Sequence, residues 1–583
     1  MCGCVLRACP ILLIMCVFWK VTLNLNKKII SFITAGMIAA SSVFAAGCKK
    51  QTPEGANYSF DCALPGNPES LDPQTASDVN SMTVIGNLFT GLMKTDETGK
   101  LEKAAAKDYT ISEDGLRYTF TLRNDCYWFF DSNEDEEADE NELTQVTAYD
   151  FEFAFKRIFN PETHSPHMEK FLCLKNAEAI IKGDANYTDL GVSAISDTEL
   201  SFELEYPSAG FLNTLTFTAA MPCNEQFFNN TKGRYGLDDR SVASNGAFFI
   251  RQWFYDPYGS DNFIYMRRNS KNDGFDRIYP SFLNFYIKDS AEEAAQSFDE
   301  GTSDVLLSFV YDKKKYGGNV VNSYFNYTLG IIINPEKKQY SNQNIRKALA
   351  YGIDKEAFAE QLPDDMLAAY GIIPPGISFL NKSYREINAD KTAAISAENN
   401  GQYIEYNADK ALQYYQDGMK EMDLKSLENI KILVPKDYMD TEYLHLVTQN
   451  WQTLFGFYIG IEEVVSEEFY QRISDGDYTM ALYPMTGSFN DPVSILEEFE
   501  KSNNQFGYNS SDFQSIVDEI KKLGNYNEGV ELYNKAENTI LNDFSFIPVF
   551  YKKQFQILGS GNHDIIYDPF TKQLNFRYAK YYE

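Results

Sequence analysis

A short acidic segment carries a dense set of potential metal ligands. Residues 131–142, DSNEDEEADENE, hold eight carboxylates in twelve positions. Oxygen-bearing side chains fall at positions 1, 3, 5, 9 and 12 of a calcium-loop template, namely Asp131, Asn133, Asp135, Asp139 and Glu142. Glu136 replaces the glycine that the template needs at position 6, and so acidic a run matches it easily by chance. We therefore expect a solvated surface loop without a metal ion, with calcium as the minor alternative.

A second group of polar residues follows an apolar strand toward the C-terminal end. Residues 480–482 are apolar, and the chain then enters a turn at 486–492 that is rich in small and turn-forming residues. A strand that ends in this way leaves backbone donors and acceptors at an edge, where a ligand can use them. A short helix is expected to begin near Val493. The stretch is predicted to lie in the wall of a binding cleft.

Motifs of hydrolytic enzymes are missing from the sequence. There is no HExxH, no GxSxG and no glycine-rich phosphate loop. The four histidines lie far apart except for His164 and His167, and we expect this pair at the surface rather than on a metal. We expect no enzyme and no cofactor, and a secreted hydrolase is the rival from another class.

The composition limits the partners of the chain. Its net charge is −31, from 83 acidic and 52 basic side chains, and such a surface repels nucleic acid. We therefore expect no polynucleotide partner. Apolar residues make up 44% of the chain, which suits a large core. The 39 tyrosines also suit surfaces that recognise partly polar ligands.

The N-terminal 47 residues have the pattern of an export signal. Lys27 and Lys28 precede an apolar run at 29–44 and a group of small residues, which is the order of a secretory signal. Residues 1–20 precede this pattern, and their apolar run is too short to span a membrane. We expect residues 1–20 to reflect a misassigned start.

The signal ends in Ala45-Ala46-Gly47-Cys48. This sequence resembles the lipobox of bacterial lipoproteins, with Ala45 in place of the usual leucine. The resemblance implies that Cys48 becomes the lipidated first residue, followed by a polar tether at 48–57. Two or more acyl chains on Cys48 would hold the protein at a membrane.

Four further cysteines remain after the signal, at Cys62, Cys126, Cys173 and Cys223. Export makes disulfides chemically feasible, with three connectivities. Their wide spacing fits neither a small disulfide framework nor a zinc site, so we favour buried free thiols over disulfides.

Local patterns predict a mixed α and β arrangement without internal repeats. Apolar and polar residues alternate in three predicted strands, near 58–62, 118–122 and 200–204. Thr147 to Asp150 reads as a capping box for a helix. The helix at 444–455 has the spacing of core packing.

Longer motifs make the chain similar to a known family. They occur in one collinear order over nearly the whole mature chain: NPESLDP (67–73), NLFTGLMKTDETGKL (87–101), DGLRYTFTLR (114–123), VTAYDFEFAFKRIFNP (146–161), TDLGVSAISDTELSFEL (188–204), SNGAFFIRQW (244–253), IRKALAYGIDK (345–355), GIIPPGI (371–377) and IPVFY (547–551). This order resembles that of family 5 extracellular solute-binding proteins, which include the oligopeptide-binding proteins of ABC importers.

The resemblance implies an α+β and α/β fold of the periplasmic-binding-protein type, in which two lobes close over a ligand and one lobe carries an inserted domain. The expected segments are lobe I at 58–87, 220–327 and 552–583, the inserted domain at 88–219, and lobe II at 328–551.

Family members hold peptides chiefly through backbone hydrogen bonds, as an added strand. By resemblance, the ligand-binding residues are Met485, Thr486, Gly487, Ser488, Asn490 and Asp491. Many members carry, four residues before the proline, an aspartate that pairs with the amino group of the peptide, and this chain has Ser488 there. Met485 replaces a family aromatic residue, and Leu482 stands where a basic residue sometimes occurs.

These departures leave three interpretations open. The amino group is anchored elsewhere, for example by Asp491; the ligand has no free amino terminus; or the alignment is shifted by one or two residues.

The resemblance also implies partners and a location. We expect a peptide ligand and the transmembrane subunits of an ABC permease with a separate ATPase. We expect a lipid-anchored monomer at the outer face of the cytoplasmic membrane or in the periplasm. The same family includes binders of metal chelates, sugars and signalling peptides, so the fold alone does not choose the cargo.

Overall fold

The computed structural model describes residues 58–582 apart from 97–99, 136–138, 273–277, 380–381, 388–394, 397–401, 428–429, 437, 439–440, 502–503 and 526–527. The chain from Tyr58 onward forms one compact unit. The predicted export signal, Cys48 and the tether lie outside the described residues.

A four-stranded sheet has the order β1-β12-β11-β10, formed by β1 (Ser59–Leu64), β10 (Phe248–Phe254), β11 (Asn262–Arg268) and β12 (Phe282–Ile287). β1 pairs in parallel with β12, and the other pairs are antiparallel. The alternation predicted for the first strand is confirmed, because Phe60, Cys62 and Leu64 are buried. They share one hydrophobic core with α3 (Val79–Leu88).

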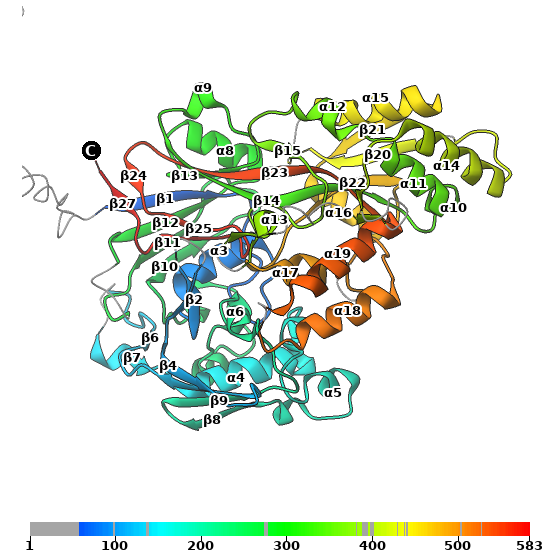
Figure 1. Cartoon of the computed structure of the whole chain (residues 1–583). Helices are drawn as coiled ribbons and strands as arrows, with labels where there is room; N and C mark the ends of the chain where they lie inside the picture. The colour runs from blue at the N-terminus through cyan, green and yellow to red at the C-terminus, as the bar shows by residue number, and fades with distance from the viewer. Residues whose placement is uncertain are drawn as a thin grey trace, which may run out of the picture. The chain divides into compact units, whose positions relative to one another are not determined.

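A second four-stranded sheet is antiparallel and lies within the predicted inserted segment. Its order is β4 (Ala106–Ile111), β5 (Arg117–Leu122), β9 (Glu199–Glu203) and β8 (Val192–Ser196). Helix α4 (Ala148–Phe159) packs on β8 and β9 (Figure 1). The predicted capping box is confirmed, since Thr147 and Asp150 bond to each other's backbone. The ring centroids of Phe155 and Phe202 lie 5.0 Å apart between the helix and the sheet.

The largest sheet has the order β13-β23-β14-β22-β20-β21, and β15 is paired to β23. Its strands are β13 (Val305–Ser308), β14 (Val320–Ile333), β15 (Met366–Ala368), β20 (Ile430–Pro435), β21 (Ile459–Val464), β22 (Met480–Met485) and β23 (Phe546–Leu558). β14 and β23 are long antiparallel partners from Val320↔Leu558 to Ile332↔Phe546. Both strands run through a predicted lobe boundary, at 327/328 and 551/552. The lobe boundaries themselves stay a prediction.

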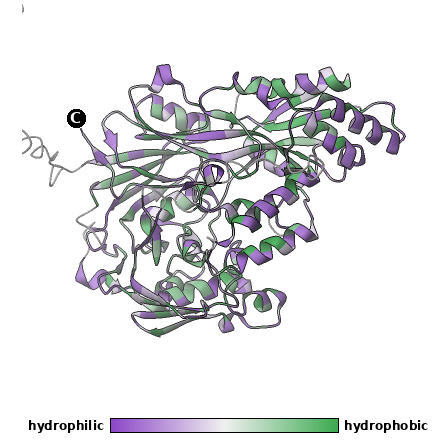
Figure 2. Ribbon diagram, viewed as in Figure 1, coloured by the Kyte–Doolittle hydropathy of each residue, from purple (hydrophilic) through white to green (hydrophobic). Residues whose placement is uncertain are grey.

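One end of this sheet is parallel and is covered by helices. β20 pairs in parallel with β21 and with β22. Helix α15 (Leu444–Phe455) buries Leu444, Val447 and Trp451, and the Trp451 indole N–H donates to the Leu349 carbonyl at 2.8 Å. The prediction that this helix packs into the core is therefore confirmed. Figure 2 shows hydrophobic and hydrophilic residues alternating along the helices and strands, as elements with one buried face require.

Cys62, Cys126, Cys173 and Cys223 are buried thiols rather than half-cystines, as the sequence favoured. Burial raises the pKa of the Cys173 and Cys223 thiols to about 12 and that of Cys62 still higher. Because the thiolate is the reactive form, these side chains should be inert in the folded protein.

We predict that the four thiols react with a disulfide reagent at pH 8 at least roughly 100-fold more slowly in the native protein than in denaturant. Absorbance of the released thiolate gives the rates, with a small thiol as control. Rapid native labelling of more than one of these cysteines, mapped by mass spectrometry, would contradict the burial.

Candidate ligand-binding site

The turn between β22 and α17 (Pro492–Leu496) is closed by its own hydrogen bonds. Asp491 is the N-cap of α17, and its Oδ1 accepts from the Val493 N–H at 2.9 Å. The Ser494 hydroxyl donates toward the carbonyls of Phe489 and Asp491 at 2.7 and 2.8 Å. The predicted start of a helix near Val493 is thus confirmed. Much of the polar content of the turn is used to begin this helix.

Two of the predicted ligand residues have clear packing roles. A Cβ on Gly487 would lie 2.1 Å from the Ser494 Oγ, so only glycine allows this close approach. The Asn490 Oδ1 accepts from the Ser378 N–H at 2.7 Å and so ties the turn to a neighbouring loop. Both residues hold the shape of the turn, and their contact with a ligand stays a proposal.

Met485 and Leu482 lie on opposite faces of β22. Met485 is 2% exposed, stands opposite Thr328 of β14 and belongs to one hydrophobic core. Leu482 is 1% exposed and belongs to another. Alternation along the strand explains the split. Both side chains are core residues, and their contact with a ligand stays a prediction.

The hydroxyls of Thr486 and Ser488 have no protein partner among the described residues. The Thr486 Oγ1 is buried without a hydrogen bond. Ser488 is half-buried, and no hydrogen bond joins its side chain to the described part of the chain. A buried hydroxyl without a partner costs free energy, so the Thr486 hydroxyl would gain from a hydrogen bond to a ligand, whereas the half-buried Ser488 hydroxyl can also bond to water.

Five aromatic side chains form a contiguous group at the same edge of the sheet, which we name the aromatic group: Phe309, Tyr327, Tyr438, Tyr470 and Tyr483. Phe309 lies 4.9 Å from Tyr327 and 4.4 Å from Tyr438 between ring centroids. The Tyr438 and Tyr470 hydroxyls are 3.3 Å apart, and the rings of Tyr470 and Tyr483 are 6.1 Å apart.

The location of the aromatic group is informative. Tyr438 follows the carboxyl end of β20, and Tyr483 lies in β22 just before its carboxyl end. In open α/β sheets, ligands bind outside the carboxyl ends of parallel strands. All of the group except Tyr327 keeps some accessible surface. The sequence indicated tyrosine-rich recognition only through composition, because the five residues come from widely separated segments.

A carboxylate that the sequence did not single out lies beside the aromatic group. Burial raises the pKa of Glu498, while the charges of Lys170 and Lys572 oppose that rise. The side chain is only half-buried, so it keeps access to solvent. Burial raises the pKa of the Tyr483 phenol, and the charge of Glu498 adds to that rise.

The turn also meets the predicted inserted domain. The Phe489 ring lies 6.4 Å from the Phe217 ring, and the Lys170 ammonium lies 4.9 Å from the centre of the same Phe217 ring. Residues from three distant segments of the chain therefore converge near Ser488.

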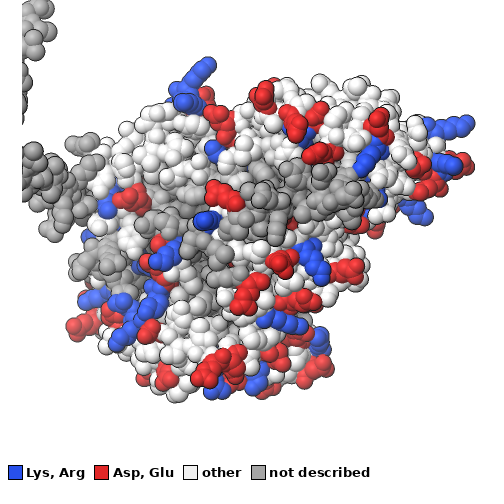
Figure 3. Space-filling view, viewed as in Figure 1, with Lys and Arg blue, Asp and Glu red and all other residues white. Residues whose placement is uncertain are grey.

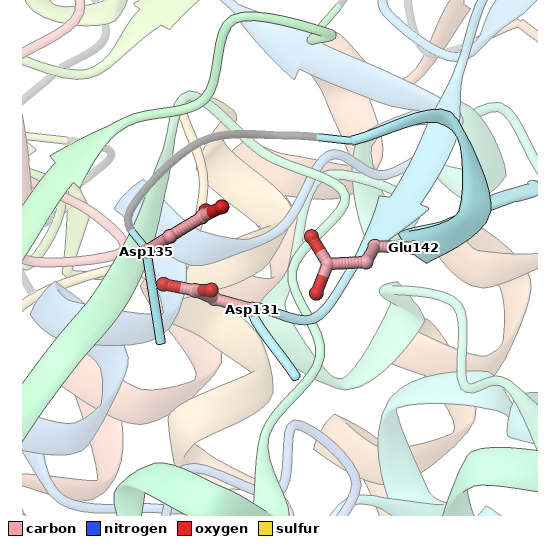
Figure 4. A group of neighbouring side chains, drawn as sticks. All are labelled: Asp131, Asp135 and Glu142. Carbon is pink, nitrogen blue, oxygen red and sulfur yellow. The ribbon is translucent and has the colours of Figure 1, made fainter. Parts of the chain in front are cut away.

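The structure brings together three members of the acidic loop. Ligand oxygens of Asp131, Asp135 and Glu142 lie within 4.8 Å of one another (Figure 4). The Glu142 Oε1 accepts from the Ser132 and Asn133 N–H groups at 2.7 and 3.2 Å. The Asn133 amide donates to Asp135 at 3.0 Å and to Asp139 at 3.4 Å.

These donors offset part of the repulsion between the carboxylates. Glu136, at the position where the calcium template has glycine, lies outside the described residues. The expectation of a solvated loop without an ion stays a prediction.

The expectation of a surface position is wrong for His167. This side chain is 7% exposed, and its Nε2 lies 2.9 Å from the Ala76 carbonyl oxygen. Burial lowers the pKa of His167. His164 is exposed, as expected. His167 is buried because its loop packs against the segment that precedes α3, a tertiary contact that the local sequence does not indicate.

Figure 3 shows acidic and basic side chains interspersed over one face of the molecule. Among the described residues, no helix combines the length and the apolar character that a membrane crossing requires.

The position of the turn in the wall of a binding cleft stays a prediction, and the class of the protein comes from comparison with known families. The profile of bacterial extracellular solute-binding proteins, family 5 Middle, matches residues 100–507. The chain belongs to this family.

Known proteins support the fold along nearly the whole chain. The oligopeptide-binding protein OppA of Bacillus subtilis is 25% identical over 529 residues, covering 88% of this chain and 90% of that protein. The substrate-binding domain of an oligopeptide ABC transporter of Bacillus anthracis is 24% identical with a TM-score of 0.71, covering 91% and 99%. Listeria monocytogenes OppA bound to peptide is 20% identical with a TM-score of 0.70, covering 91% and 100%. The predicted fold class is confirmed.

Asp491 provides a pH-dependent test of the turn. Burial raises the pKa of Asp491 to about 7, whereas an unfolded aspartate titrates near ~3.9. Between these values the folded chain binds more protons than the unfolded chain, so stability falls as the pH rises through this window. Asp491→Asn keeps an oxygen for the Val493 N–H but does not titrate. We expect the free energy of unfolding of the variant, measured relative to that of wild type, to rise by about 2–4 kcal/mol from pH 4 to pH 7.5.

Urea unfolding at several pH values measures this difference. Asp354→Asn makes the same substitution at another N-cap aspartate, which is half-buried, and serves as the matched control. A difference for Asp491→Asn that stays constant with pH would show that this carboxyl is not the titrating group.

Proposed function

We propose that the protein is the substrate-binding lipoprotein of a peptide ABC importer. It captures oligopeptides outside the cell and delivers them to the transmembrane subunits of a permease, whose ATPase is a separate subunit. The observation that supports this proposal most is the aromatic group at the carboxyl edge of the parallel strands, where Glu498 acts on Tyr483 of β22, the strand that leads directly into Thr486 and Ser488. Proteins similar to this chain along most of its length are named as oligopeptide-binding.

In this proposal the peptide lies in a cleft between lobe I and lobe II. Backbone hydrogen bonds supply most of the affinity, and aromatic walls accept varied side chains. The Tyr438, Tyr470 and Tyr483 hydroxyls are polar groups on otherwise apolar walls, so they fix orientation without demanding one sequence. Binding and release are the whole activity, and no catalytic step is assigned to any residue.

The anchor for the amino terminus is altered in this chain. Ser488 supplies a neutral hydroxyl, and the carboxylate of Asp491 is 8% exposed and caps a helix. Glu498 is a half-buried carboxylate that acts on the Tyr483 phenol, and Lys170 and Lys572 act on it with opposite charge. A ligand with a blocked amino terminus, or a non-peptide solute such as a sugar or chelate, is the second candidate.

The remaining parts of the proposal concern location. Lipid on Cys48 holds a monomer at the outer face of the cytoplasmic membrane, and residues 48–57 separate the anchor from the folded chain.

Thermal shift against a peptide library tests the cargo. Peptides with free and acetylated amino termini should raise Tm in proportion to the logarithm of concentration over Kd, with about 2.7 kcal/mol gained at 100 times Kd. Chromatography of the same samples should show intact peptide. A shift with sugars or chelates but with no peptide would refute the peptide assignment, and cleavage of the peptide would favour a hydrolase.

Ser488→Asp tests the place of the anchor. A carboxylate at this position should strengthen binding of peptides with a free amino group by about tenfold, equal to ~1.4 kcal/mol, because it adds an ion pair. Calorimetry with matched free and acetylated peptides measures the effect, and Ser488→Asn is the uncharged control. Equal affinities of wild type and Ser488→Asp for the free peptide would place Ser488 away from the anchor.

A further inference from the structure

A cavity of about 560 Å³ lies beside α12 (Lys355–Ala359) and β15. Its lining includes Lys355, Leu367, Tyr370, Arg385, Tyr406 and Tyr551. None of its lining residues belongs to the β22–α17 turn or to the aromatic group. The size falls within the range of small-molecule sites.

Lys355 is the unusual group in this cavity. Its ammonium lies 5.2 Å from the centre of the Tyr370 ring, and no hydrogen bond or ion pair joins it to the residues that the structure describes. Burial lowers the pKa of Lys355 to about 7, with no charge opposing that change. By contrast, the buried Lys552 pairs with Asp365 at 2.5 Å. The Lys355 side chain is half-buried, and an ammonium held partly out of water without a partner costs free energy that a bound anion would offset.

The other charged residues of the lining are already engaged or face solvent. Arg385 is paired with the buried Glu537. The Asp354 Oδ1 accepts from the Ala357 N–H at 3.0 Å. Glu356 and Glu405 are exposed. Lys355 is thus the cation that remains available to a ligand inside the cavity.

Aromatic and aliphatic side chains share the lining of the cavity with its charged residues. Tyr370 is half-buried, and Tyr406 and Leu367 are 42% and 47% exposed, so each keeps free surface. The Tyr551 hydroxyl accepts from the Gly371 N–H at 3.1 Å, which fixes the back of the cavity. A single available cation beside aromatic and aliphatic side chains suits a carboxylate on an apolar or aromatic body better than it suits inorganic phosphate, which needs several donors.

We propose that this cavity binds an organic carboxylate, with its anionic end on the Lys355 ammonium and its apolar body against Tyr370, Tyr406 and Leu367. The carboxylate belongs either to a free small acid or to the C-terminus of a peptide. The second source rests on the proposed peptide-binding function, and the first does not.

The test uses phenylacetate and its neutral analogue phenylacetamide, with Tm and calorimetry as readouts on the whole mature protein. Wild type should bind phenylacetate at least tenfold more tightly than phenylacetamide. Lys355→Met should lose this preference. Lys410→Met should keep it, because Lys410 also lies over a tyrosine ring, at 5.3 Å from the centre of Tyr351, outside this cavity. Equal binding of acid and amide by wild type, or an unchanged preference in Lys355→Met, would overturn the proposal.

A second arm separates the two sources. If the carboxylate is a peptide terminus, amidating that terminus should weaken binding at least tenfold in wild type but not in Lys355→Met. If amidation has the same effect in both, a peptide source is excluded. The phenylacetate arm is independent of peptide binding, so its outcome stands even if no peptide binds. Lys355→Met removes a half-buried cation that no ion pair joins to the described residues, so its Tm without ligand should equal or exceed that of wild type. Lys355→Gln repeats the test with a polar side chain.

Discussion

The ladder between β14 and β23 is the interaction on which the rest of the structure depends. It pairs residues over nearly the whole length of both strands. β22 is added on the free side of β14, and β13 and β15 are added to β23. The β22–α17 turn continues from the first of these additions, and the Lys355 cavity is lined in part by β15. Both candidate binding sites are therefore positioned by the same pair of strands.

Buried charges hold the loops around this framework, and most of them are paired. Arg157 binds Asp72 through both terminal nitrogens, at 3.1 and 2.5 Å, which joins α4 to the segment before α3. Arg385 and Glu537 form a second pair, and the Glu537 carboxylate also accepts from the N–H groups of Ile372 and Ile373. Removing one member of such a pair leaves an unpaired buried charge, which is strongly destabilising. Lys355 differs from these pairs, because it is half-buried and no ion pair joins it to the described residues.

Local sequence was sufficient for the elements that depend on local physics. Alternation identified β1, β5 and β9, the capping box identified α4, and the apolar spacing identified the buried face of α15. The collinear motifs identified the family, because the order of motifs along the chain is kept even at low sequence identity.

The candidate site was only partly predictable. The turn was found, but the packing roles of Gly487 and Asn490 depend on Ser494 and Ser378, and the aromatic group depends on tertiary contacts between five segments. His167 was placed wrongly for the same reason, since its burial comes from a segment about ninety residues away.

The ladder is not uniform, and its irregularities have a mechanical consequence. Register shifts occur next to the predicted lobe boundary, between Tyr324 and Tyr327, where β14 has the extra residue, and between Leu329 and Gly330, where β23 has it. At Gly330, a Cβ would lie 2.2 Å from the Phe546 ring, so the second break is filled by an aromatic side chain. Sliding one strand along the other would break many hydrogen bonds together, whereas bending at a break leaves the flanking pairs intact. The pair of strands should therefore resist sliding of one strand along the other, and it should bend most easily at its bulges.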